Sequence, residues 1–103
     1  MASEFNFHCE ALLEYEAAAA FYLNEGSPGV ATRFVDSVEA AIGSIVANPE
    51  RWRVFQSPQI RRCVLQEFPF VIYYQLEVRT DRVLLYAIMH SSRKPGYWHR
   101  RVR

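Results

Sequence analysis

Apolar positions near the start of the chain repeat with the spacing of a helix. Ala11, Tyr15, Ala18 and Tyr22 follow one another at intervals of four, three and four residues. This spacing places all four on one side of an α-helix, so it predicts a first helix from Ala11 to about Asn24. The run of alanines inside this segment strengthens the prediction, since alanine has the highest helix propensity.

A second helix is predicted directly after the first. Gly26 suits the end of a helix, Ser27 suits an N-cap, and Pro28 suits a first helical position, so the three form a tight helix-to-helix turn. Apolar residues at helical spacing then continue from residue 34 to residue 45. Pro49 disfavours helical geometry in the residue before it, so this helix ends near Asn48 and the two helices form an antiparallel hairpin.

The pattern then changes to segments rich in valine, isoleucine, leucine and tyrosine, separated by short polar or proline-containing breaks. Short links and the lack of crossover helices favour antiparallel pairing. The fold class is therefore α+β, with an antiparallel β-sheet, an N-terminal strand and a two-helix hairpin packed on one face. The predicted strands are residues 5–9, 53–56, 60–66, 70–78 and 82–90.

Alternation along the last strand predicts which side chains share a face. Leu84, Tyr86, Ile88 and His90 have the same parity. One face of the sheet must meet the helices. The other face, if open, carries tyrosines and basic side chains on a shallow surface.

Length and composition predict one domain over residues 1–103. The chain has 103 residues, half of them hydrophobic, which suffices for one core and not for two. No apolar run reaches the roughly 18 residues of a membrane span, and the N-terminus lacks a signal-peptide pattern, so we expect a cytoplasmic protein with no membrane contact. Cys9 and Cys63 are far apart in sequence and are expected to be free thiols.

The small net charge of +1 conceals a strong separation of charge. Residues 1–50 carry eight acidic residues and one arginine, for a net charge of −7. Residues 51–103 carry eleven basic and three acidic residues, for a net charge of +8. The basic half could face nucleic acid, an acidic protein surface, or the acidic half of the same fold.

The basic half also contains the strongest candidate chemistry. If the strand that carries Arg61 and Arg62 lies close to the end of the last strand, guanidinium groups and an imidazole converge, and such a site could hold phosphate. In a metal-independent ribonuclease, His90 would act as acid or base and Tyr97 as an acid, with an arginine stabilising the phosphate. The candidate target- or partner-binding residues are Arg61, Arg62, Arg93, Lys94, Tyr97 and Trp98, and the catalytic candidates are His90, Tyr97, Arg62 and Arg93.

Each of these candidate residues could instead have a purely structural role. Adjacent arginines on a strand point to opposite faces, so at most one of Arg61 and Arg62 enters such a site. Tyr97 and Trp98 could instead fold back over a sheet edge or the core. The spacing of the histidines and cysteines matches no metal site, and we expect neither a metal nor a cofactor.

These residues and their order resemble the RelE/ParE toxin superfamily of type II toxin-antitoxin modules, and the tail is similar to its ParE, or plasmid stabilisation, branch. The resemblance covers nearly the whole chain. It rests on the segments ALLEYEAAAAFY, GVATRFVDSVEAAI, NPERW, IRRCVLQEFPFVIYY and VLLYAIMHSSRKPGYW. Its most specific parts are Arg61 and Arg62 leading to Phe68, Pro69 and Phe70, and then His90, Arg93, Pro95 and Trp98.

The resemblance implies the same fold and a cognate antitoxin that wraps the toxin in a hetero-oligomer. ParE-like members with an assigned target act on DNA gyrase, whereas RelE-like members cut messenger RNA on the ribosome. RelE-like sites use lysines in the central strands, and here the only lysine is Lys94, so that ribonuclease role does not transfer residue by residue.

Three hypotheses follow. The first is a toxin that binds and inhibits gyrase without breaking a bond, and it is favoured here. The second is a ribosome-dependent endoribonuclease that uses His90 and Tyr97. The third is an inactive family member that only binds an antitoxin. Whether the chain is an enzyme is left open by the sequence.

Overall fold

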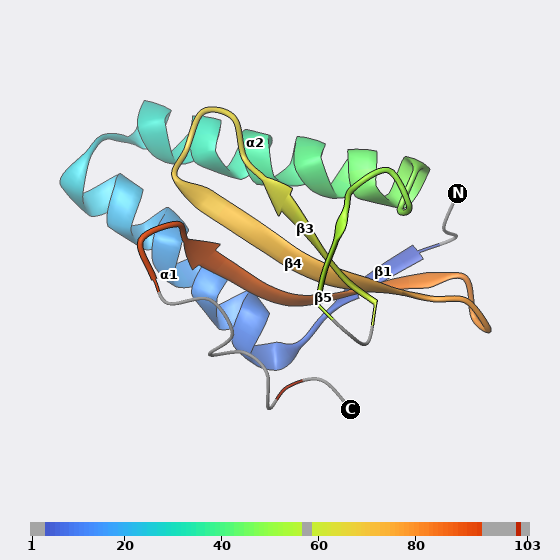
Figure 1. The fold of residues 1–103 in the computed structure, drawn as a ribbon. Coiled ribbons are helices and arrows are strands. Elements are labelled where there is room, and N and C mark those ends of the chain that lie inside the picture. The colour runs from blue at the N-terminus through green and yellow to red at the C-terminus, as the bar shows by residue number, and fades with distance from the viewer. Residues whose placement is uncertain (1–3, 57–58, 94–100, 102–103) are drawn as a thin grey trace.

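Two helices pack against one face of a five-stranded sheet in the computed structural model (Figure 1). The structure describes residues 4–56, 59–93 and 101. This arrangement confirms the predicted α+β class and the predicted order of elements. The elements are β1 (Glu4–Phe7), α1 (Cys9–Glu25), α2 (Pro28–Ala47), β2 (Val54–Gln56), β3 (Ile60–Val64), β4 (Phe70–Glu77) and β5 (Arg82–His90).

The turn between the helices forms as predicted. The backbone N–H of Gly26 donates to the carbonyl of Tyr22 at 3.0 Å and ends α1. Ser27 is the N-cap of α2, because its hydroxyl oxygen accepts from the N–H of Val30 at 3.2 Å. These contacts are local in sequence, which explains why the pattern of residues was sufficient to locate the turn.

The start of α1 differs from the prediction. Residues 5–9 were expected to form a strand, but β1 ends at Phe7 and α1 already begins at Cys9. His8 is the N-cap, and its Nδ1 accepts from the N–H of Glu10 at 3.2 Å. Histidine is an uncommon N-cap, so none of the usual capping residues marks the start of this helix.

The sheet is mixed, with strand order β1-β5-β4-β3-β2. Strands β2 to β5 pair in antiparallel fashion, as predicted from their short links. Strand β1 instead pairs in parallel with β5, so a wholly antiparallel sheet was too narrow a prediction. The helices and three strands separate β1 from β5 in sequence, so no short link restricts their relative direction.

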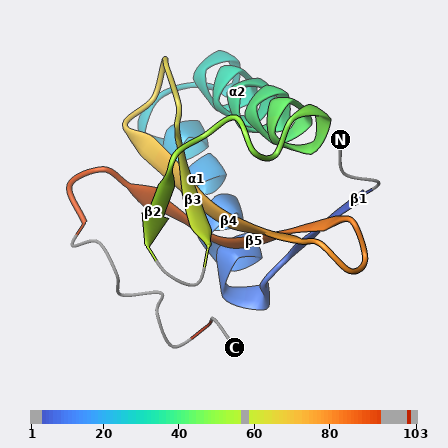
Figure 2. The same cartoon turned by 45° about the vertical axis from the view of Figure 1, so that its right-hand side comes forward.

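The main core lies between the helices and one face of the sheet (Figure 2). Phe34 of α2 is fully buried at its centre and makes ring contacts with Tyr22, Phe68 and Phe70 at 5.0–5.3 Å between centroids. A second cluster lies on the opposite, open face of the sheet. Its buried members are Ile60, Val71, Tyr73, Tyr86, Ala87 and Met89.

A β-bulge in the last strand overturns the predicted parity. Tyr73 pairs with Ala87, but Tyr74 pairs with Leu85, so Tyr86 is an extra residue in β5. The bulge places Tyr86 in the second cluster, on the open face of the sheet, and Ile88 in the main core. Side chains before and after the bulge therefore exchange faces, and alternation alone could not reveal this change.

The structure also tests the predictions about the cysteines and about membrane-spanning helices. Cys9 is exposed, Cys63 is buried, and both are free thiols, as expected. In the described part of the chain, neither helix combines the length and apolar character of a membrane span.

Candidate functional site

Arg62 lies on the open face of the sheet, where β2 and β3 meet. Its guanidinium carbon lies 5.5 Å from the centroid of the Phe55 ring, within cation–π range. Phe55 in turn contacts the ring of Tyr73 edge to face, at 5.4 Å. We call these three residues the open-face cluster. It presents a cation and a partly exposed aromatic ring to solvent over a buried tyrosine.

Two effects act on the Tyr73 hydroxyl in the open-face cluster. Burial raises the pKa of Tyr73, and the nearby positive charge of Arg62 partly opposes that rise. The hydroxyl therefore keeps its proton near neutral pH. The charge of the cluster comes from Arg62, which suits recognition of an acidic or polar partner.

Arg61 lies on the face of the sheet that packs against the helices, and its side chain binds backbone carbonyls. Its Nη1 donates to the carbonyls of Trp52 at 2.5 Å and Glu50 at 3.2 Å. These bonds hold the loop that leads from α2 into β2. The two neighbouring arginines thus point to opposite faces, as strand geometry predicts, and only Arg62 is on the open face.

His90 does not join Arg62. Because of the bulge, His90 lies on the helix side of the sheet, where its ring contacts Phe70 edge to face at 5.4 Å. Its Nδ1 lies 2.7 Å from the hydroxyl of Ser92 and accepts from the Ser92 N–H at 3.1 Å. The imidazole is thus exposed at the end of β5, on the opposite face from Arg62.

Arg93 points to α1 and forms an ion pair with Glu14 at 3.7 Å. The same carboxylate binds Arg101, whose Nη1 and Nη2 donate to its two oxygens at 3.0 Å each. Arg101 is buried, with 7% of its surface exposed. One carboxylate on α1 therefore holds two arginines of the C-terminal basic region.

The structure does not bring the predicted group together. Among the described candidates, Arg61, Arg62 and His90 lie in three separate places, and only Arg93 is next to another candidate, because its N–H donates to the His90 carbonyl at 3.0 Å. Lys94, Tyr97 and Trp98 lie outside the described residues. Sequence reasoning missed Phe55, Glu14 and Arg101. No local pattern marked Glu14 or Arg101, because their contact joins positions 87 residues apart.

Comparison with known proteins assigns the family. Residues 5–95 match the family model described as the ParE toxin of type II toxin-antitoxin system, parDE. The chain belongs to the ParE toxin family. The resemblance inferred from the sequence is thereby confirmed, and so is the type of protein, a toxin of a type II toxin-antitoxin system. No curated protein sequence matches the chain.

Solved structures share the ParE/RelE fold with this chain. A chain from the chromosomal ParDE toxin-antitoxin system of P. aeruginosa superposes with a TM-score of 0.72 at 20% identity, over 87% of this chain and 96% of that one. A mutant of the E. coli toxin RelE in the free state gives 0.70 at 15% identity, over 100% of both chains. The isolated E. coli RelE toxin gives 0.61 at 14% identity, over 93% of this chain and 92% of that one.

Proposed function

We propose that this ParE family toxin arrests growth by binding and inhibiting DNA gyrase, and that a cognate antitoxin neutralises it. Within the family resemblance, ParE-like members with an assigned target act on gyrase. The proposal places the toxin in the cytoplasm with its target. In this mechanism the chain forms a complex and breaks no bond.

The open-face cluster is the observation that carries this proposal. Arginine and large aromatic residues are the types that contribute most to protein–protein interfaces. Arg62 and Phe55 are exposed together, and Tyr73 below them supports the Phe55 ring. Such a surface fits an acidic or polar patch of a protein target. Arg93, Lys94, Tyr97 and Trp98 are proposed as further binding residues of the same half of the chain.

The ribonuclease alternative has less support from the described residues. General acid–base catalysis requires the acid, the base and the phosphate-binding group to lie within hydrogen-bonding reach of one substrate. His90 and Arg62 lie on opposite faces of the sheet, and the guanidinium groups of Arg61 and Arg93 bind a loop and α1, respectively. Within this part of the chain, the residues favour binding over cleavage.

An antitoxin partner fits the distribution of charge. The second half of the chain has a net charge of +8, so an acidic antitoxin segment would be attracted to it and would cover the toxin's basic surface. The proposed complex is a hetero-oligomer of toxin and antitoxin.

The first test follows radiolabelled thymidine and leucine incorporation in a bacterial host just after induction of the toxin. An early fall in thymidine incorporation, with leucine incorporation intact, is the expected result. An early fall in leucine incorporation would contradict the proposal and indicate the ribosome. Normal incorporation of both, with folded protein present, would indicate an inactive member that only binds an antitoxin.

The second test measures inhibition of purified gyrase in a supercoiling assay. The Arg62→Ala variant is expected to need about tenfold more protein for the same inhibition, since interface arginines are frequent hot spots. Arg79→Ala removes an exposed arginine in the turn between β4 and β5 and is the matched control. Equal inhibition by both variants would remove Arg62 from the target-binding surface.

A further inference from the structure

Strand β1 lies at one end of the sheet, and β2 lies at the other (Figure 2). Its inner side pairs with β5, and among the described residues no strand lies on its outer side. The His8 N–H donates to the Leu85 carbonyl at 2.9 Å, so the main chain of His8 faces β5. Main-chain groups alternate in direction along a strand, so the N–H and C=O groups of Phe5 and Phe7 point outward. This edge is therefore open to another extended chain.

The outer edge of β1 lacks the features that usually prevent one sheet from pairing with another. Strand β1 contains no lysine, no proline and no bulge. Glu4 is its one charged residue, and Nε of Arg82 in the same chain donates to its Oε1 at 2.7 Å. This ion pair reduces the charge that a second strand would meet at the edge.

A groove of about 430 Å³ lies beside this edge, between β1 and α2. Ile42 and Val46 give the groove an apolar wall. A Cβ on Gly43 would meet no atom within 4 Å, so the absence of a side chain there keeps the groove open. Phe5 lines the groove and is 37% exposed. An added strand therefore has room for large apolar side chains on the helix side of the sheet.

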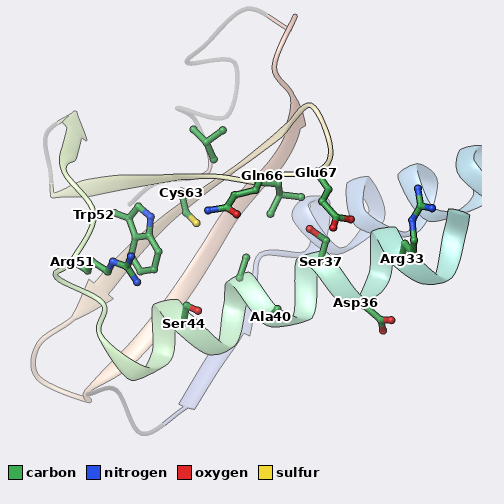
Figure 3. Close-up of a pocket in the computed structure, with 13 residues that line it drawn as sticks. Arg33, Asp36, Ser37, Ala40, Ser44, Arg51, Trp52, Cys63, Gln66 and Glu67 are labelled. Atoms are coloured by element: carbon green, nitrogen blue, oxygen red, sulfur yellow. The ribbon is translucent and has the colours of Figure 1, made fainter.

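Another groove along α2 lacks a comparable preference. It lies between α2 and β3 and has a volume of about 580 Å³ (Figure 3). Its charged lining is balanced between basic and acidic residues, namely Arg33, Arg51, Asp36 and Glu67. The charge of that groove therefore selects no occupant, whereas the residues of β1 complement a second copy of themselves.

We propose that two copies of this toxin pair in antiparallel fashion through β1, so that their two sheets join into one. Asn6 lies at the two-fold axis, opposite Asn6 of the second copy. Phe5 lies opposite Phe7 of the second copy, and Glu4 lies opposite its His8. In this register the outward-facing N–H and C=O groups of both phenylalanines form main-chain hydrogen bonds between the copies. The pairing does not depend on which target the toxin has.

On the helix side of the sheet, this register brings aromatic side chains together. Phe7 stacks against Tyr15 of α1 with 5.9 Å between centroids, and Phe5 contacts Phe7 edge to face at 5.8 Å. Across the axis, Phe5 meets Phe7 of the second copy, and cross-strand aromatic pairs stabilise neighbouring strands. Burial of the exposed part of Phe5 in the groove adds to the stability of the pair.

On the open side of the sheet, the same register pairs hydrogen-bond donors with acceptors. The Glu10 N–H donates to Nδ1 of His8 at 3.2 Å, so in the neutral ring the proton lies on Nε2. That N–H donates to the Glu4 carboxylate of the second copy. The two Asn6 amides meet at the axis, where each offers both a donor and an acceptor.

The interface is small, because each copy contributes one strand of four residues. Stable interfaces bury about 1,600 Å² in total, so we expect a dimer that dissociates on dilution, with a Kd of roughly 1–100 µM. Antiparallel pairing places equivalent side chains on the same side of the joined sheet. The dimer therefore presents both of its open-face clusters in one direction.

Exchange of charge at Asn6 tests the position of the axis. Asn6→Lys places two ammonium groups opposite each other in the dimer, and Asn6→Asp places two carboxylates there, whereas in the monomer this side chain is exposed. We expect each variant alone to raise the dimerisation Kd about tenfold or more, because like charges then meet at the axis. An equimolar mixture of the two should restore dimerisation. The control Asn24→Lys makes the same change at an exposed position of α1 and should leave the Kd unchanged.

Sedimentation equilibrium of the full-length toxin over a wide range of concentrations measures the Kd, and thermal unfolding shows that each variant is folded. Hydrogen exchange of the wild-type toxin gives a readout that needs no substitution. The Phe5 and Phe7 amides should exchange more slowly at high protein concentration. The Asn6 amide faces β5 in this alternation and should change less.

Three results would overturn the proposal. The first is a wild-type toxin that stays monomeric to about 1 mM, which is far above the expected Kd. The second is a dimer with the same Kd in Asn6→Lys as in wild type, because its interface would then lie elsewhere. The third is slowing of the Phe5 and Phe7 amides only after the antitoxin is added, which would assign this edge to the antitoxin instead.

Discussion

Arg101 and Glu14 form a paired contact across 87 positions of sequence, with both terminal nitrogens of the guanidinium donating to the two carboxylate oxygens at 3.0 Å. The same two side chains also bind β5. Glu14 accepts from the Ile88 N–H at 3.1 Å, and Arg101 donates to the Tyr86 carbonyl at 2.9 Å. Strand β1 pairs with β5 only as far as Leu85. Glu14 and Arg101 therefore satisfy backbone groups of β5 beyond the end of its parallel neighbour.

We predict that Glu14→Ala lowers the free energy of unfolding by about 3 kcal/mol, because it leaves the buried charge of Arg101 with only the longer ion pair to Glu10, at 3.5 Å. The Ile88 N–H loses its acceptor as well. Urea denaturation measures the change. Glu16→Ala, an exposed acid on the same helix, is the control and should change stability by no more than about 0.5 kcal/mol.

A double-mutant cycle separates the pair from its surroundings. If Glu14 and Arg101 act as a unit, the Glu14→Ala, Arg101→Ala double variant will lose less stability than the two single variants together. Additive losses would show that the two side chains stabilise β5 independently.

The two neighbouring arginines of β3 should contribute differently to the stability of the protein. Arg61→Ala removes the donor from the carbonyls of Glu50 and Trp52 and is expected to cost about 1–3 kcal/mol. Arg62→Ala removes an exposed side chain and should cost no more than about 0.5 kcal/mol. Thermal unfolding of the two variants checks this, and an equal loss would contradict the difference between the two faces.

Alanine substitutions at two glycines, Gly26 and Gly43, should change the stability of the protein in opposite directions. A Cβ on Gly26 would lie 2.8 Å from the Tyr22 carbonyl oxygen, the group to which the Gly26 N–H already donates. Gly26→Ala should therefore destabilise the protein by about 1–3 kcal/mol, as an overpacked site does. A Cβ on Gly43, within α2, meets no atom within 4 Å. Gly43→Ala should stabilise it by about 0.5–1 kcal/mol, since alanine favours the helix.

Denaturant midpoints for the two glycine variants, measured under one condition, test this prediction. A stabilised Gly26→Ala variant would show that the turn between the helices yields to the added methyl group.

The two thiols should differ in reactivity. Burial raises the pKa of Cys63 to about 11, an effect that the charge of Arg51 partly offsets, whereas Cys9 is exposed. At pH 8, a disulfide reagent should therefore modify Cys9 quickly and Cys63 slowly. The Cys9→Ser variant isolates the buried thiol, and rapid modification of that variant would contradict the burial of Cys63.

The raised pKa of Cys63 also predicts how stability depends on pH. Between pH 9 and about 11 the folded chain keeps a proton that the unfolded chain releases, so stability falls as the pH rises through this window. Below pH 9 the thiol is protonated in both states and its contribution is complete. Cys63→Ala should show a shallower fall than wild type, and parallel curves would remove the thiol as a cause.

The helical hairpin illustrates what local patterns determine. The signals of Gly26, Ser27 and Pro28 act within one turn of chain, and the helical spacing of apolar residues depends only on near neighbours. Short links likewise set the antiparallel pairing of β2 to β5. For these elements, residues close in sequence were sufficient to predict both the type of structure and its place in the fold.

The candidate site was decided by contacts that local patterns do not contain. The extra residue at Tyr86 turns His90 away from Arg62, and this bulge depends on the register between β4 and β5. The parallel pairing of β1 and the contact of Glu14 with Arg101 join segments from opposite ends of the chain. The sequence by itself determined the helices, the antiparallel strands and the family. Only the tertiary structure decided which charged groups share a face, because register and long-range burial depend on the whole packed chain.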